Sequence, residues 1–417
     1  MTDATADTVE ARTVSLDYDG RTGQFAGIVF VNLVLQILTL GIFRFWARTR
    51  ERRYLWSHVR LEGDRLEYTG TGMELFVGFL IAMVALAAIG GVYQFLLTMF
   101  AANPVILGVL VSGYSILILF LVFFAIYRTR RYRLTRTVWR GIRGTMERAA
   151  VRYAFRALGY YLLTVVTLGL AAPAMRVGLT RFEIENMRFG DRPFAFDGRA
   201  GELFRYWLVP WAILAATLAG AGWTILRSRG LGPDVDASET LPIVQAAEIA
   251  AQLGFVAFLA ALVWYRVKEF RYLAGRVSFE GMQFSSGLGL GRVVWIYVSF
   301  FMAASVLFVA LFLAIAFAAL LAKAAAMSPE AIEQGPEALF GGIDGQTAVV
   351  VYFAVGLSAM VLMQTLGRVM VFHRLARSVV TTLALTGSQD FSRVAQALDT
   401  APSTGEGLAD AFDLGNF

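Results

Sequence analysis

The feature that most constrains this fold is a run of 53 consecutive residues without a charge, from Leu75 to Tyr127. Further uncharged apolar runs cover residues 206–226, 249–265, 293–322 and 345–367. Roughly 20 apolar residues are enough to cross the hydrocarbon core of a bilayer, so each run predicts a membrane-spanning helix. The hydrophobic content of 57% also does not fit a water-soluble surface. We therefore predict a polytopic membrane protein.

The longest run divides at Asn103-Pro104, a typical turn pair. Hydropathy then predicts eight apolar segments: 25–46, 75–100, 105–127, 155–175, 204–226, 244–265, 293–322 and 347–369. Residues 128–153 hold nine arginines against one acid, whereas residues 323–346 are mainly acidic. Because basic connectors stay on the cytoplasmic side, the charges predict that both termini are cytoplasmic.

Pieces of the chain recur. The stretch Thr39–Phe76 returns 128 positions later as Thr167–Phe204, with TLG, an arginine followed by an aromatic, Gly-Asp and ELF in common. Partial copies lie at residues 131–141, 271–281 and 373–387, and a half copy lies at 16–25. The copies contain short alternating runs around a glycine, which predict two-stranded hairpins. We expect several of these hairpins to stack into one small cytoplasmic sheet.

These patterns predict an all-α polytopic membrane protein with six to eight transmembrane or re-entrant helical segments, internal repeats and short cytoplasmic β-hairpins. The expected organisation is an N-terminal cytoplasmic segment, two membrane repeats, a partial third repeat and a polar tail: residues 1–24, 25–153, 154–292, 293–387 and 388–417.

Segment 155–175 conflicts with simple crossing, because basic connectors flank it on both sides. Segment 25–46 is likewise preceded by a copy of the aromatic-x-Gly element, Tyr18 to Gly20, and followed by the arginine element. We interpret both as re-entrant, with turns at Gly41, Gly169 and Pro173, so that six helices span. Irregular backbone at membrane depth requires shielding by protein or a water-filled cavity. The alternative is that both segments cross, which their apolar length permits.

The run TLGIFRFWARTRERRY at Thr39–Tyr54, followed by YTGTGMELF, resembles the YjgN-like family of bacterial inner-membrane proteins, a domain-of-unknown-function family. The resemblance extends from about Leu16 to Gly387. The second copy departs from the pattern, with Ala174 in place of Trp46 and Gly178 in place of Arg50. The resemblance implies an inner-membrane location and supplies no reaction or ligand.

Arginines gather beside aromatic residues at the ends of the apolar segments, where they suit anionic lipid headgroups. The predicted lipid contacts are Trp46, Arg48, Arg50, Arg52, Arg53, Tyr54, Arg128, Arg130, Arg131 and Tyr132. Glu74 and Glu202 match across the repeat at helix starts, where a carboxylate offsets the helix dipole or forms a cation site.

The sequence predicts no catalytic residue, metal site or cofactor. The chain has no cysteine, and its two histidines, His58 and His373, have no metal ligands at suitable spacing. The net charge of +6 is carried mainly by arginines that lie beside helix ends. This position favours membrane lipids over nucleic acid as partners. We favour a small-molecule or anion transporter or channel-like protein, and the alternative is a non-catalytic envelope scaffold that binds anionic lipid or a protein partner through its basic cytoplasmic face. The oligomeric state is not predicted.

Overall fold

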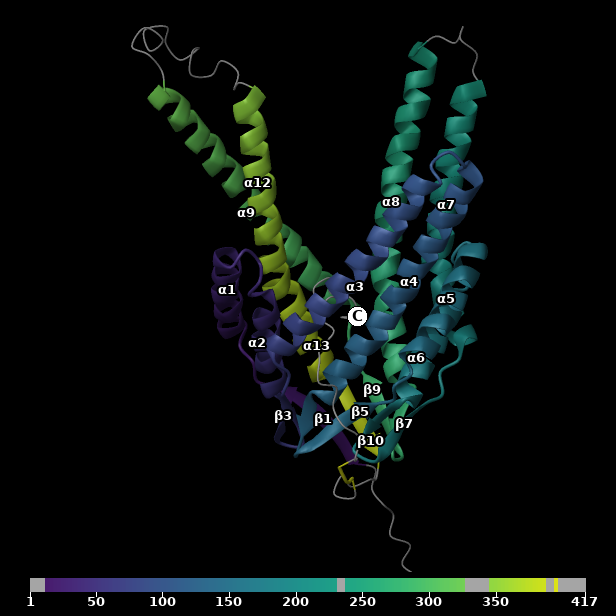
Figure 1. Cartoon of the computed structure of the whole chain (residues 1–417), viewed down its shortest axis with the longest axis vertical. Helices are drawn as coiled ribbons and strands as arrows, with labels where there is room; N and C mark the ends of the chain where they lie inside the picture. Colours follow the sequence, from purple (N-terminus) through teal and green to yellow (C-terminus); the bar gives the residue numbers. More distant parts are fainter. Residues whose placement is uncertain (1–11, 231–236, 327–344, 388–393, 397–417) are drawn as a thin grey trace, which may run out of the picture.

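The computed structural model describes residues 12–230, 237–326, 345–387 and 394–396. Ten short strands close into an antiparallel barrel at one end of the molecule, and the helices rise from the same side of that barrel (Figure 1). The strands are β1 (Arg12–Tyr18), β2 (Val59–Leu61), β3 (Asp64–Tyr68), β4 (Thr137–Trp139), β5 (Ile142–Met146), β6 (Met187–Phe189), β7 (Arg192–Phe196), β8 (Val277–Phe279), β9 (Met282–Ser286) and β10 (Leu383–Gly387).

The helices connect these strands in antiparallel pairs. They are α1 (Thr22–Leu38), α2 (Arg44–Ser57), α3 (Gly72–Met99), α4 (Pro104–Thr135), α5 (Ala150–Val166), α6 (Ala172–Glu185), α7 (Ala200–Gly230), α8 (Ala237–Ala274), α9 (Leu290–Ala326), α12 (Gly345–Leu366), the π-helix η1 (Gly367–His373) and α13 (Arg374–Thr382). The long pairs diverge away from the barrel, whereas the α1–α2 and α5–α6 pairs stay close to it (Figure 1).

Four hairpins of the barrel are continuous in the chain. In β2–β3, Leu61 pairs with Asp64 across a two-residue turn, and both turn residues, Glu62 and Gly63, have positive φ. Such turns match the right-handed twist of the flanking strands, and glycine supplies the second left-handed position at no steric cost. All four turns lie at the end of the barrel opposite the helices.

The fifth hairpin is assembled from the two ends of the chain. Among the described elements, β10 follows helix α13 and β1 precedes helix α1, and the two strands pair antiparallel from Arg12 opposite Gly387 to Ser15 opposite Ala384. The half copy at residues 16–25 and the partial copy at 373–387 are therefore complementary halves of one unit. The barrel consequently has fivefold pseudo-symmetry.

The predicted all-α class with short cytoplasmic β-hairpins is wrong, because the strands form a closed barrel. An isolated two-stranded hairpin is marginal in water and leaves two unpaired edges. Five hairpins joined edge to edge leave none, since β1 also pairs with β2. The hairpins do join into one sheet, as the predicted stacking implies, but the prediction does not include the pairing of β1 with β10 that closes the sheet into a ring.

Apolar side chains from all ten strands fill the interior of the barrel. They are Leu16, Leu61, Leu66, Trp139, Ile142, Phe189, Phe194, Phe279, Phe284 and Leu385, joined by Met282 and by Val394 from beyond β10. Strands of three to seven residues are also too short to cross a bilayer, which takes about 9–11 residues per strand. The barrel is therefore a packed platform outside the membrane.

Five described helices are long and apolar enough to cross a membrane: α3 and α4, and the segments Ala200–Leu226, Val244–Ala274 and Leu290–Ala318 of α7, α8 and α9. Most of their side chains are not buried inside the protein, as lipid contact requires. Helix α12 packs beside α9. Apolar segments 75–100 and 105–127 thus form two helices as predicted, with the Asn103 side chain accepting hydrogen bonds from the first amides of α4.

Candidate functional site at the junction of helices and barrel

A ring of five equivalent arginines surrounds the end of the barrel from which the helices rise. Each lies six residues before a strand that follows a helix: Arg53, Arg131, Arg181, Arg271 and Arg377. We call this set the arginine ring. All of its members except Arg131 are exposed. In four of the five units an exposed basic side chain therefore lies at the level where the apolar helices begin.

The arginine ring also has a structural role. Arg53 and Arg181 donate to the carbonyls of Gly70 and Gly198, in the turn that leads from the second strand to the next helix. Arg131 donates through Nε to the carbonyl of Met146 at 2.8 Å. These bonds connect the end of one helix to the strand end or turn that precedes the next helix.

The two glutamates that match across the repeat join neighbouring units. Glu74 accepts from Arg136 at 2.8 Å and from the Tyr132 hydroxyl at 2.7 Å. Glu202 lies 2.7 Å from Arg276, which occupies the position equivalent to Arg136. Both carboxylates thus bind arginines of the next hairpin.

Three other glutamates are buried at the helix bases. Glu51 lies 2.6 Å from Arg368 and accepts from the Asn32 amide. Glu183 pairs with Arg130 and accepts from the Tyr153 hydroxyl, and Glu269 pairs with Arg176 and Arg266. Because a buried carboxylate is costly unless it is paired, these contacts fix the packing of α2, α6 and α8.

A cavity of about 450 Å³ opens beside Glu51, between α2 and the α9–α12 pair. Its polar wall contains Arg48, Glu51, Arg52 and Arg368, and its other side is formed by residues of α9, α12, η1 and α13. Three guanidinium groups against one carboxylate give this wall a net charge of about +2. The cavity therefore favours an anionic group.

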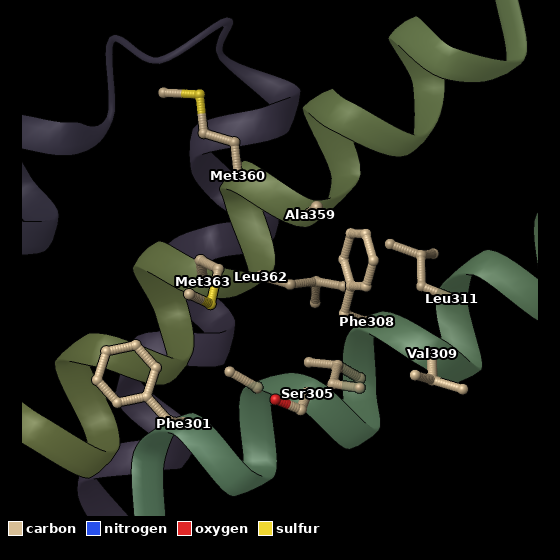
Figure 2. Close-up of a pocket in the computed structure, with 11 residues that line it drawn as sticks. Phe301, Ser305, Phe308, Val309, Leu311, Ala359, Met360, Leu362 and Met363 are labelled. Atoms are coloured by element: carbon tan, nitrogen blue, oxygen red, sulfur yellow. The ribbon is translucent and has the colours of Figure 1, made fainter. Parts of the chain in front are cut away.

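A second, mainly apolar cavity of about 580 Å³ lies between α9 and α12 (Figure 2). Phe301 and Phe308 from α9 and Met360 and Met363 from α12 line it from opposite sides. Met363 also lines the charged cavity. The two cavities are therefore neighbours along the same helix pair.

The two TLG segments form tight turns between antiparallel helices. Gly41 has φ +87° and Gly169 has φ +90°, a region that favours glycine. Thr39 donates to the Leu35 carbonyl and accepts from the Phe43 amide. Thr167 makes the same pair of bonds one repeat later. Each threonine thereby satisfies backbone groups on both sides of its turn.

The helices of these pairs are shorter than a typical spanning helix. Helices α1 and α5 have 17 residues and α2 and α6 have 14, or about 25 Å and 21 Å, against a hydrocarbon core of about 30 Å. Both ends of each pair meet the barrel, and the tips expose Leu40 and Leu168 almost completely. Pro173 lies in the first turn of α6 and is not a turning point. The depth of the pairs in the membrane stays a prediction.

The structure divides the residues predicted to contact lipid into two groups. Arg50, Arg53 and Arg128 are exposed. The others are at least partly buried, and several have partners within the chain: the Tyr54 hydroxyl donates to the Arg21 carbonyl, and Tyr132 to Glu74. Arg48 and Arg52 meet in the charged cavity, whereas Arg130, Arg131 and Tyr132 belong to the base of α4. Lipid contact by these residues stays a prediction.

Sequence reasoning missed the buried glutamates. Glu51 and Glu269 both lie eight residues before the next strand, and Arg48, Arg176 and Arg266 lie eleven before it. An alignment of the repeats on the hairpins would have shown this spacing. Within the described ranges, no group of three or more histidine, aspartate or glutamate side chains is arranged to hold a metal ion.

A sealed barrel that carries long apolar helices on one side defines a multi-pass integral membrane protein. The chain belongs to the family described as "Bacterial protein of unknown function (DUF898)", which matches residues 13–411. It is 31% identical over 129 residues to Inner membrane protein YjgN of Escherichia coli (strain K12), and 33% identical over 70 residues to the protein of that name from Salmonella typhimurium.

These two matches cover 31% and 17% of this chain and 30% and 18% of the relatives, less than a third of their length. No solved structure matches the chain. The predicted resemblance and inner-membrane location are confirmed, and the chain is an integral protein of the bacterial inner membrane.

Proposed function

We propose that this protein is a non-catalytic membrane protein that binds anionic lipid headgroups through its arginine ring, on the cytoplasmic face of the inner membrane. The observation that carries this proposal is the position of the ring. Four of its five members are exposed where the lipid-facing helices leave the barrel. Each basic side chain near an anionic bilayer surface contributes about 1 kcal/mol to the free energy of binding to that surface.

Transport of a small molecule or anion is the second candidate. It is favoured by the two short helix pairs with TLG turns, since many transporters build their sites from segments that do not cross the membrane. The apolar filling of the barrel counts against a path along the barrel axis. A transport path would therefore run between the helices and leave the membrane beside the barrel.

The lipid proposal is tested by removing charge from exposed positions near the membrane. The variant carries Arg181→Gln, Arg271→Gln and Arg377→Gln, all at exposed members of the arginine ring. A matched control removes the same charge at the opposite end of the barrel, with Arg65→Gln, Arg140→Gln and Arg192→Gln. Both proteins are purified with native lipid, and the bound anionic lipid per chain is measured at low and high salt.

We expect the first variant to retain less anionic lipid at low salt, with a smaller difference at high salt because salt screens exposed charges. The control is expected to resemble the parent protein. Equal retention by the two variants at low salt would exclude the arginine ring as the lipid-binding surface. Uptake of labelled anions into proteoliposomes tests the transport alternative separately.

A further inference from the structure

The charged cavity combines features that an exposed arginine does not have. Arg48 and Arg52 are both more than nine-tenths buried, on one face of α2, while Arg368 approaches from η1. Glu51 binds Arg368 through one carboxylate oxygen and Asn32 through the other, and Arg52 donates to the Tyr68 hydroxyl at 3.4 Å, so Glu51, Arg52 and Arg368 are held in place. An anion that enters meets guanidinium groups that are already oriented.

The π-helix η1 forms part of this cavity. Gly367, Arg368, Val371 and Phe372, all from η1, line it. A π-helix is rare and is found frequently at functional sites, because the wider turn repositions side chains relative to a regular helix. Here it directs the Arg368 side chain toward Glu51 of α2, although α12 itself continues along α9.

The apolar cavity continues from the charged one along both helices. On α9, Tyr297 lines the charged cavity and Phe301, one turn further, lines the apolar cavity. On α12, Met363 lines both. The apolar lining extends from Phe301 to Leu311, about 15 Å along α9 at 1.5 Å per residue. Charge at one end and a long apolar groove at the other match an amphiphile.

We infer that this pair of cavities binds one amphiphile with a phosphate headgroup, its phosphate beside Arg48, Arg52 and Arg368 and its hydrocarbon chain between α9 and α12. The inference deepens the proposed lipid-binding function and rests on it. The wall charge of about +2 selects a phosphate monoester, which carries close to two negative charges at neutral pH. Planar guanidinium groups bind phosphate oxygens bidentately.

The test uses the purified full chain and native mass spectrometry of bound lipid. Phosphatidic acid is the monoester probe, phosphatidylglycerol the diester with one charge, and phosphatidylcholine the zwitterion. Arg48→Gln removes one headgroup contact, and Ser305→Trp fills the apolar groove. Arg50→Gln is the matched control, because Arg50 is exposed on the same helix and does not line the cavity.

We expect one phosphatidic acid per parent chain, bound more tightly than the other two lipids. Arg48→Gln should weaken it about tenfold, the loss of one hydrogen bond to a charged group, and Ser305→Trp should weaken it as well. Arg50→Gln should keep parent affinity. Inorganic phosphate at the same concentration should not displace the lipid, since it has no chain for the groove.

Parent-like affinity of both Arg48→Gln and Ser305→Trp would overturn this site. Displacement of the lipid by equimolar inorganic phosphate would overturn the inference that the ligand is an amphiphile and would indicate a simple phosphate site. If the site variants behave as the parent does while loss of the exposed arginines still lowers total anionic lipid, the proposed function stands without this site. Ser305→Trp leaves the charged wall intact, so the test remains decisive if Arg48→Gln fails to fold.

Discussion

The Tyr18 hydroxyl lies 2.9 Å from Nε2 of His373, joining the first strand to the π-helix η1 across 355 positions of the chain. The His373 ring also stacks on Phe25, with ring centroids 4.8 Å apart, and is fully buried. This contact closes the unit that the two chain ends build together. It therefore connects the titration of one histidine to the closure of the barrel.

Burial, together with the charges of Arg377, His58 and Arg374, lowers the pKa of His373 to about 4. The other ionisable groups against the ring are Tyr18, whose pKa burial raises, and Tyr54. An unfolded chain takes up the histidine proton near pH 6.5, before the folded chain does. The contribution of neutral His373 to the free energy of unfolding is thus fully present above pH 6.5 and is lost as the pH falls toward 4.

We expect the free energy of unfolding to drop by about 3 kcal/mol from this source between pH 7 and pH 4. The comparison is with His373→Gln, which keeps hydrogen-bonding groups but does not titrate. Denaturant unfolding of both proteins at several pH values gives the difference. A constant gap between the two stability curves from pH 7 to pH 4 would contradict the prediction.

The TLG turns make a second prediction. Gly41→Val places a β-branched side chain at φ +87°, so we expect a loss of more than about 1 kcal/mol. Leu40, with φ +50°, is the matched control, because Leu40→Gly removes a side chain that is exposed and conformationally strained. Thermal unfolding in detergent should show a lower midpoint for Gly41→Val and little or no loss for Leu40→Gly.

The position of Gly41 as a turn residue could be predicted from the sequence because TLG recurs in an apolar segment flanked by arginines on both sides. The structural role of Thr39 could not be predicted, because its hydroxyl forms hydrogen bonds with two backbone groups on either side of its own turn. Hydropathy likewise shows where apolar helices lie. It does not show that the α1–α2 and α5–α6 pairs return to one barrel.

The barrel could not be predicted for a physical reason. Each strand is only three to seven residues long, and alternation over so few positions predicts a hairpin but not its neighbours. The ring depends on β1 and β10, which are separated by nearly the whole chain. Glu51 and Arg368 are 317 positions apart, so the charged cavity is also a product of ring closure.

The buried pair of Glu183 and Arg130 gives the third prediction. Removal of one partner leaves the other charge buried, which typically costs 3–5 kcal/mol, so we expect Glu183→Ala to lower stability by about that amount. Glu185→Ala, at an exposed position two residues along the same helix, should change stability by less than about 0.5 kcal/mol. Chemical denaturation of both variants gives the comparison, and equal losses would refute the role of the pair.

Membrane topology gives the fourth prediction, because both ends of each short helix pair meet the barrel. Single cysteines at Asp17 and Arg60, on either side of α1–α2, should be labelled by an impermeant reagent from the same side of the membrane. Cysteines at Arg143 and Arg188, around α5–α6, should label from that side too. The chain has no cysteine of its own to interfere. We expect this side to be the cytoplasm, and labelling of one pair from opposite faces would disprove re-entry.

The last prediction concerns the mouth of the barrel that faces away from the helices. Residues 394–396 cover part of it: the Ala395 carbonyl accepts from the Asp191 amide at 3.0 Å, its amide donates to the Asp191 carboxylate at 3.1 Å, and Val394 joins the apolar filling. Gly190 permits this approach, since a Cβ there would lie 2.2 Å from the Ala395 carbonyl oxygen.

Gly63 is a matched control for Gly190, because it also has positive φ in a hairpin turn, but a Cβ at Gly63 would meet no atom within 4 Å. Alanine at either position has the strain of a left-handed conformation, about 1 kcal/mol or more. Only Gly190→Ala also expels residues 394–396 from the mouth. We therefore expect Gly190→Ala to lower the unfolding midpoint clearly more than Gly63→Ala. When both substitutions are made in a Val394→Ala background, most of the difference between them should disappear. Equal effects of the two glycine substitutions would mean that the contact with Ala395 contributes nothing to the stability of the barrel.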